Sequence, residues 1–164
     1  MGLALTLLAV PSGADTTWVT DRDDTKGFLD VKAIAHGHGR GDRLKHTVTT
    51  FAKWRSKDLW CGVVAMEFPG LDRELIVFYR KKLRAIVVNE RTGEGIGNPR
   101  VTRPTRRRVA VAFPRRWLRP GLDEYRWFVR TVRRGSDCPA RDGDKSVVVR
   151  DRAPRRGRSI LHRL

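Results

Sequence analysis

The chain is poor in cysteine, in long apolar runs and in helical patterns. Its two cysteines, Cys61 and Cys138, form no C-x-x-C motif, so neither a zinc ribbon nor a thioredoxin-like site has support. No apolar stretch reaches the roughly 20 residues that a membrane-spanning helix needs. There is also no G-x-S-x-G motif and no internal repeat. These absences argue against a long-helix fold, a membrane anchor within the chain and a serine hydrolase of the common type.

Positive charge is what the chain has in excess. It has 35 Lys and Arg against 18 Asp and Glu, a formal net charge of +17, and residues 100–164 alone have 20 basic against 6 acidic side chains. This basic half indicates an electrostatic partner such as nucleic acid, anionic lipid or an anionic wall polymer. Arg outnumbers Lys 27 to 8, so the alternative is that a GC-rich genome places arginine on the surface without any partner.

The first 14 residues resemble the second half of a secretory signal peptide. The apolar run 2–10 is followed by Pro11-Ser12-Gly13-Ala14, with small residues at the −3 and −1 positions of a cut after Ala14. The basic segment that begins such peptides is missing, which a mis-assigned start or a truncated fragment would explain, and a buried first strand is the alternative. We therefore expect a secreted or cell-surface protein with a partial signal peptide (1–14), one domain (15–157) and a basic tail (158–164).

Alternating apolar and polar residues predict strand after strand between residues 28 and 134. The pattern is clear around residues 29–36, 109–113 and 125–130, and β-branched or aromatic runs occupy residues 74–79 and 83–88. Arg80, Lys81 and Lys82 separate the last two runs, which predicts a hairpin with a basic tip. Seven or eight strands with at most one short helical turn, near residues 114–121, predict an all-β antiparallel sandwich.

An acidic cluster precedes the first long strand. Asp21, Asp23, Asp24 and Asp30 lie within ten residues of a basic chain, and Thr25 and Gly27 lie between them. Carboxylates, hydroxyls and loop carbonyls are the oxygen ligands that Ca²⁺ prefers, so the cluster is a candidate structural Ca²⁺ site. The alternative is a polar loop whose carboxylates cap turns and pair with arginine.

Two other sets of side chains could support chemistry. His36 and His38 lie two apart on a predicted strand and so point the same way, and with His46 they could bind Zn²⁺ or Cu²⁺. Three carboxylates near strand ends, those of Glu67, Asp72 and Glu74, could act as paired acids in a hydrolase. No recognisable catalytic arrangement supports a metal-dependent or a hydrolytic activity, so we expect a protein that is not an enzyme.

Exposed aromatic rings are the remaining candidates for a binding surface. Trp54 and Trp60 flank a polar loop and are the best candidates among the five tryptophans. The basic hairpin tip at Arg80, Lys81 and Lys82 is the natural source of charge beside them. The two cysteines fit an exported protein with one disulfide, or are unpaired and buried.

Several motifs, in order along the chain, resemble a group of secreted actinobacterial β-sandwich domains. They are Asp23-Asp24-Thr25-x-Gly27-x-Leu29-Asp30-Val31, His36-Gly37-His38, Val111-Ala112-Phe113-Pro114, Tyr125-x-Trp127 and Asp151-x-Ala153-Pro154-x-x-Gly157. These domains are distantly similar to jelly-roll modules that bind carbohydrate and hold a structural calcium, so the resemblance implies a jelly-roll-like fold. The family commonly has a second cysteine just before the last motif; here Val147 to Arg150 stand there, so Cys138 pairs with Cys61 or stays free.

We therefore expect a secreted, non-enzymatic binding or structural module. Its expected ligand is an anionic or carbohydrate polymer of the cell surface, such as a cell-wall or extracellular polysaccharide, with contacts from Trp54, Trp60 and the basic tip. One alternative is nucleic-acid binding without sequence preference, through Arg106-Arg107-Arg108 and Arg115-Arg116. A hydrolase of unknown substrate is the other.

Overall fold

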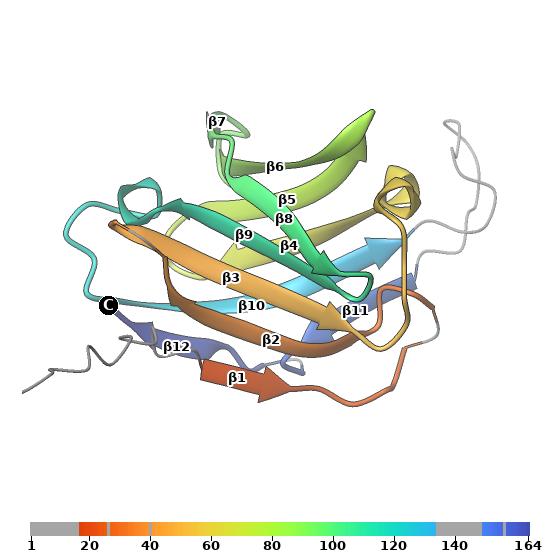
Figure 1. Cartoon of the computed structure of the whole chain (residues 1–164). Helices are drawn as coiled ribbons and strands as arrows, with labels where there is room; N and C mark the ends of the chain where they lie inside the picture. The colour runs from red at the N-terminus through yellow and green to blue at the C-terminus, as the bar shows by residue number, and fades with distance from the viewer. Residues whose placement is uncertain (1–16, 26, 40, 134–148, 156) are drawn as a thin grey trace, which may run out of the picture.

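Two antiparallel β-sheets pack face to face in a computed structural model of the chain (Figure 1). The structure describes residues 17–25, 27–39, 41–133, 149–155 and 157–164. The predicted all-β sandwich is confirmed. The predicted signal peptide, residues 1–14, lies outside the described residues.

The strands of each sheet come from distant parts of the chain. The first sheet has the order β1-β2-β3-β9-β8, with bounds Thr17–Thr20, Val31–His38, Arg43–Thr50, Arg108–Pro114 and Arg100–Thr105 in that order. The second sheet has the order β11-β10-β4-β5-β6-β7, with bounds Val149–Ala153, Glu124–Arg133, Gly62–Phe68, Arg73–Arg80, Lys82–Asn89 and Gly95–Gly97. The last strand, β12 (Ile160–Arg163), also pairs with β10.

Period-two alternation builds the core between the sheets. In β4 the side chains of Val64, Met66 and Phe68 are at most 1% exposed, and they share one apolar cluster with Ile34 and Trp127. Because side chains alternate across a strand, one face of each sheet is dry while the other meets water. This burial is the main stabilising term of a sandwich.

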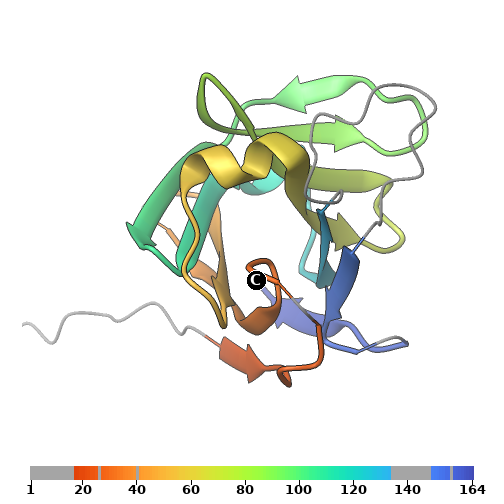
Figure 2. The same cartoon turned by 90° about the vertical axis from the view of Figure 1, so that its right-hand side faces the viewer.

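Two of the chain's crossings between the sheets are short 3₁₀ segments, and the short connection from β7 to β8 is another crossing. The segment η1 (Ser56–Cys61) connects β3 to β4, and η2 (Arg115–Trp117) connects β9 to β10. In Figure 2, η1 lies across one end of the sandwich, between the ends of the two sheets. The β5–β6 turn and the loop before β2 lie at the same end (Figure 1). That end therefore gathers the acidic cluster, the basic hairpin tip and the loop with Trp60.

The predicted hairpin is confirmed, since β5 and β6 pair up to Arg80 opposite Lys82, with Lys81 at the turn. The number of strands differs from the prediction: the described residues form twelve strands and two 3₁₀ segments, because β1, β7 and β12 are too short to show a pattern. The expected basic tail is partly wrong as well. Ile160 and His162 are buried against β10, so this segment is a strand of the domain.

Candidate functional site

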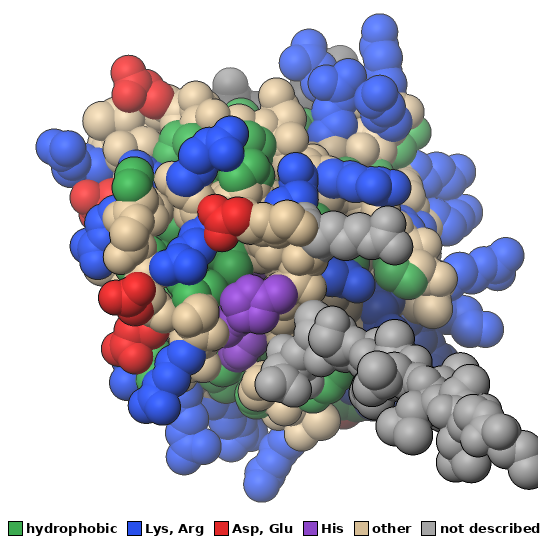
Figure 3. Space-filling view, turned by 60° about the vertical axis from the view of Figure 1, so that its left-hand side comes forward, with side chains coloured by type: hydrophobic (Ala, Val, Ile, Leu, Met, Phe, Trp, Pro, Cys, Tyr) green, Lys and Arg blue, Asp and Glu red, His purple; other side chains and the backbone are tan. Residues whose placement is uncertain are grey.

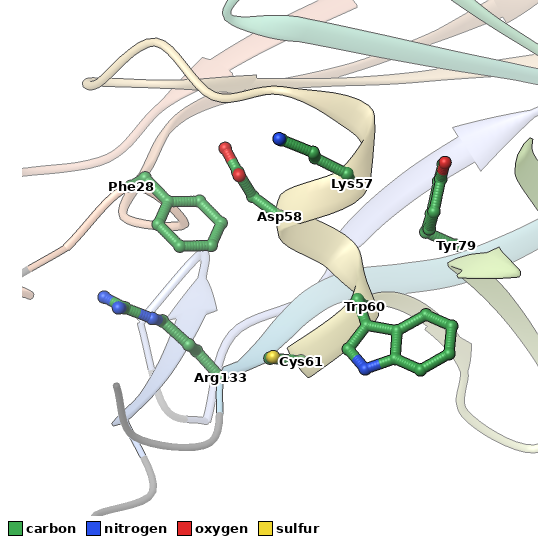
Figure 4. Close-up of a pocket in the computed structure, with 7 residues that line it drawn as sticks. All are labelled: Phe28, Lys57, Asp58, Trp60, Cys61, Tyr79 and Arg133. Carbon is green, nitrogen blue, oxygen red and sulfur yellow. The ribbon is translucent and has the colours of Figure 1, made fainter. Parts of the chain in front are cut away.

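The most accessible aromatic surface lies in a groove beside η1. The groove has a volume of about 510 Å³, and it is lined by Phe28, Lys57, Asp58, Trp60, Cys61, Tyr79 and Arg133. In Figure 4, Phe28 and Arg133 lie on one side of η1, and Trp60 and Tyr79 lie on the other. The residues come from the loop before β2, from η1, and from the ends of β5 and β10.

Trp60 is the exposed ring of this groove. Its side chain is 57% exposed, and Trp18, in β1, is the other large exposed hydrophobic residue at 47%. On the other side of η1 the Arg133 guanidinium lies over the Phe28 ring, 4.8 Å from the ring centre. A cation over an aromatic face is held in place without losing its charge. The groove thus combines an open aromatic face with a fixed positive charge.

Among the described residues that line the groove, the one acidic side chain is that of Asp58, and it is already bonded to Arg55. Asp58 Oδ2 accepts a hydrogen bond from the Arg55 backbone N–H at 2.6 Å, and Asp58 Oδ1 lies 3.2 Å from an Arg55 guanidinium nitrogen. This pairing caps the start of η1 and offsets the Asp58 charge. Lys57 and Arg133 then give the groove a positive character.

The basic tip extends this surface. Arg80, Lys81 and Lys82 are all exposed, and they follow directly on Tyr79, which lines the groove. Lys81 has φ of 64°, so the turn holds its backbone in the left-handed region. Trp60 and the basic tip, both predicted as ligand contacts, thus lie at the same end of the molecule.

Trp54 is a correction to the predicted contact set. Its side chain is only 3% exposed and belongs to the core, and the Arg103 guanidinium stacks on it, 3.9 Å from the ring centre. Trp54 therefore supports the loop before η1 from inside and cannot offer its face to a polymer. Both tryptophans flank the same polar loop, so nothing in the local sequence separates them.

The acidic cluster forms a second cavity at the same end. This cavity has a volume of about 610 Å³ and is lined by Asp23, Asp24, Thr25, Gly27, Asp30, Phe51 and Ala52. Three of the four predicted carboxylates therefore lie together. Asp21 does not line the cavity, and its Oδ1 accepts a hydrogen bond from the Arg22 backbone N–H.

A fifth carboxylate joins from the far end of the sequence. Ligand oxygens of Asp24, Asp30 and Asp151 all lie within 4.8 Å of one another. Asp30 is 2% exposed and Asp151 is 8% exposed. Burial, contact with the Asp23 side chain and the negative charge of Asp151 raise the pKa of Asp30 to about 7. The local sequence pattern could not reveal Asp151, because Asp151 lies far along the chain and comes close to this loop only when β11 takes its place in the sheet.

The other three histidines gather around His162 at the far end of β2, and Tyr125 bonds two of the four. The Tyr125 hydroxyl lies 2.9 Å from His46 Nε2 and 2.6 Å from His162 Nδ1, and the His36 and His162 rings stack with centres 4.0 Å apart. His38 lies 5.2 Å from His162, and histidine reaches the surface as one patch (Figure 3). The sequence predicted that His36, His38 and His46 could lie close together, but it did not point to His162.

One ring nitrogen each of His36, His46 and His162 already takes part in a hydrogen bond. Trp127 Nε1 donates to His36 Nδ1 at 3.0 Å, so a neutral His36 has its proton on Nε2. Among the described residues, the group of three whose ligand atoms lie within 4.8 Å of one another is the acidic one. The histidines form no such group, so the predicted Zn²⁺ or Cu²⁺ site is not formed.

The carboxylates predicted for a hydrolase form a structural cluster. Glu67 and Glu74 lie opposite each other on β4 and β5, and the Arg130 guanidinium contacts both, at 2.5 and 3.4 Å. Burial raises the pKa of Glu74, and the nearby charge of Arg130 opposes that rise. Asp72 lies in the turn between these strands with φ of 50°. The arrangement pairs the two glutamates through one arginine.

Cys61 lies at the end of η1 and is not a free cysteine. Cys138 lies outside the described residues, so the predicted pairing of the two stays a prediction. Across the residues that the structure describes, no helix is long and apolar enough to cross a membrane.

Comparison with known proteins adds no assignment. No known protein family, curated protein or solved structure matches the chain. The resemblance to secreted actinobacterial sandwich domains therefore stays a prediction from the motifs.

Proposed function

We propose that the protein is a non-enzymatic binding module for an anionic polysaccharide outside the cell. The observation on which this depends is Trp60, 57% exposed in a groove where the only carboxylate among the described residues, that of Asp58, is bonded to arginine. The partial signal peptide predicted at residues 1–14 supports a location at or beyond the cell surface.

The chemistry of the groove suits a charged sugar chain. The apolar face of a sugar ring packs on an aromatic face such as that of Trp60. Carboxylate or sulfate groups on the same chain would pair with Lys57, Arg133 and the exposed tip at Lys81 and Lys82. The net charge of +17 draws an anionic polymer toward the protein before these contacts form.

Replacing Trp60 tests the proposal. Because Trp60 is exposed, Trp60→Ala removes the stacking face with little effect on stability, and we expect binding to polygalacturonate to weaken by about tenfold. Affinity electrophoresis in gels that contain polygalacturonate or a neutral glucan measures this loss. Trp18→Ala is the matched control, because Trp18 is the other exposed tryptophan and does not line the groove.

The control should bind as the unchanged protein does. Equal loss in both variants, or retardation by neither polymer, contradicts the proposal.

Within the described residues, the two arginine clusters predicted for nucleic-acid binding do not form one patch. Arg106 and Arg107 precede β9, whereas Arg115 and Arg116 follow it. At roughly 3.3 Å per residue the seven-residue strand separates the two clusters by about 23 Å. A single-stranded DNA arm belongs in the same experiment: binding that falls steeply with salt and is unaffected by Trp60→Ala would favour nucleic acid over polysaccharide.

A further inference from the structure

We propose that Asp24, Asp30 and Asp151 together bind one Ca²⁺ ion, which ties the loop before β2 to strand β11. This site differs from the one that the sequence predicted. Asp151 replaces Asp21, and the ion joins two segments more than 120 residues apart in the sequence.

The geometry of the three carboxylates fits one shared cation. Their ligand oxygens lie within 4.8 Å of one another. Oxygens bound to one Ca²⁺ at 2.3–2.6 Å can be at most about 5 Å apart, so a single ion can reach all three. Thr25 and Asp23 line the same cavity and offer further oxygens.

The cavity lining explains the choice of ion. The polar side chains around it are carboxylates and one hydroxyl, without histidine or cysteine. Oxygen ligands select a hard cation rather than zinc or copper. Ca²⁺ accepts irregular sets of six to eight oxygens, whereas Mg²⁺ requires a near-ideal octahedron.

An orphaned oxygen points independently to a ligand. Asp30 lines the cavity and is 2% exposed, yet its Oδ1 is buried and has no hydrogen-bond partner among the described residues. A buried carboxylate oxygen without a partner is costly, and a fold keeps one only when something offsets the cost. A bound cation supplies that missing partner.

Asp151 is held ready for this role by the backbone. The Val31 N–H donates to its Oδ2 at 2.7 Å, and the Arg152 N–H donates to its Oδ1 at 2.6 Å. These bonds fix the carboxylate and leave lone pairs on both oxygens. Asp24 is the exposed member of the three: its Oδ2 lies 3.5 Å from an Arg155 guanidinium nitrogen in an ion pair that a bound ion would displace.

Thermal unfolding of the full chain in EDTA and in CaCl₂ tests the site. Extracellular calcium modules bind with Kd of about 10⁻⁴–10⁻³ M. At a hundredfold excess of Ca²⁺ over Kd, the melting temperature should rise by roughly 5–10 °C. An equal concentration of MgCl₂ controls for ionic strength and should give a smaller rise. An unchanged melting temperature in Ca²⁺ overturns the proposal.

Asp30→Asn and Asp24→Asn should each abolish most of the rise. Asp123→Asn should keep it, because Asp123 has a 98% exposed side chain and lies outside the cluster. Without Ca²⁺, Asp30→Asn should melt no lower than the unchanged protein, since it removes a buried carboxylate that lies beside those of Asp24 and Asp151. A full calcium response in Asp30→Asn overturns the proposal, and if that variant does not fold, a full response in Asp24→Asn does so.

Discussion

Lowering the pH from 7 to 5 should destabilise the protein by several kcal/mol, and the histidine cluster is the reason. Burial and the neighbouring His38 lower the pKa of His36 to about 4. Burial and the charges of His36 and His38 lower the pKa of His162 to about 3. Burial also lowers the pKa of His46 well below its ordinary value. All three groups lie between the sheets, so each stays neutral in the folded protein under conditions where it would be charged in water.

The sign of the effect follows from where the proton binds. An unfolded histidine has a pKa of about 6.5 and takes a proton below that pH, while the folded histidine does not. The stabilising contribution of each neutral histidine is therefore fully present above about pH 6.5, and it is lost as the pH drops toward the pKa of the folded histidine. Each group contributes at most about 1.4 kcal/mol per pH unit, or about 1.8 kcal/mol between pH 7 and 5. The three together come to about 5 kcal/mol.

The raised pKa of Asp30 acts in the opposite direction. The folded protein binds a proton at Asp30 as the pH falls through about 7, before the unfolded chain does, so acidification stabilises the fold through this group. Its contribution of about 2 kcal/mol leaves a net loss of about 3 kcal/mol. His38 and Arg163 lie at the mouth of the histidine cavity, and the Arg163 guanidinium also disfavours a further positive charge inside.

Urea unfolding at pH 7, 6 and 5 measures this loss directly. His162→Gln removes one of the three groups, so we expect its stability at pH 7 to be lower but its decline with acid to be about one third less steep. His38→Gln is the matched comparison: His38 is exposed and acts only through its charge on His36 and His162, so this variant should change the decline with acid less than His162→Gln does. A flat pH profile in the unchanged protein, or an identical decline in His162→Gln, would show that the cluster does not control acid stability.

The histidine cluster and the acidic cluster show how far the sequence alone could lead. Local alternation was sufficient to predict the sandwich, the β5–β6 hairpin and the grouping of Asp24 with Asp30. It could not bring His162 to His36 or Asp151 to Asp30. Those contacts arise because β12 and β11 both pair with β10, and such long-range pairing depends on the whole sheet rather than on neighbouring residues.

The two tryptophans beside η1 show a second limit. Trp54 and Trp60 have the same side chain and similar neighbours in sequence, but Arg103 from β8 covers only Trp54. Which ring is buried is decided by a strand about 50 residues away. The structure therefore keeps Trp60 as a candidate ligand contact and gives Trp54 a supporting role.

Replacing Trp54 should be among the most destabilising single changes in the protein. Trp54→Ala removes a 3% exposed ring from the apolar cluster, and a large aromatic residue cut back to alanine in a core costs about 3–5 kcal/mol. Urea unfolding at pH 7 followed by far-ultraviolet circular dichroism measures the loss without depending on tryptophan emission. Trp60→Ala is the matched comparison, because an exposed tryptophan of the same loop should change stability by no more than about 0.5 kcal/mol.

Arg103 should also support the loop before η1, because its guanidinium donates hydrogen bonds to three acceptors around that loop. It donates to the backbone carbonyls of Trp54 and Arg106 and to Ser56 Oγ, at the first residue of η1. Arg103→Met keeps an apolar stem over the ring but leaves these acceptors unpaired, so we expect the free energy of unfolding to fall by about 1–3 kcal/mol.

If Trp54→Ala and Trp60→Ala instead lower the free energy of unfolding by the same amount, the buried ring does not support η1. If Trp54→Ala leaves stability unchanged and abolishes polygalacturonate binding, Trp54 is a ligand contact after all, and the assignment of the groove to Trp60 is wrong.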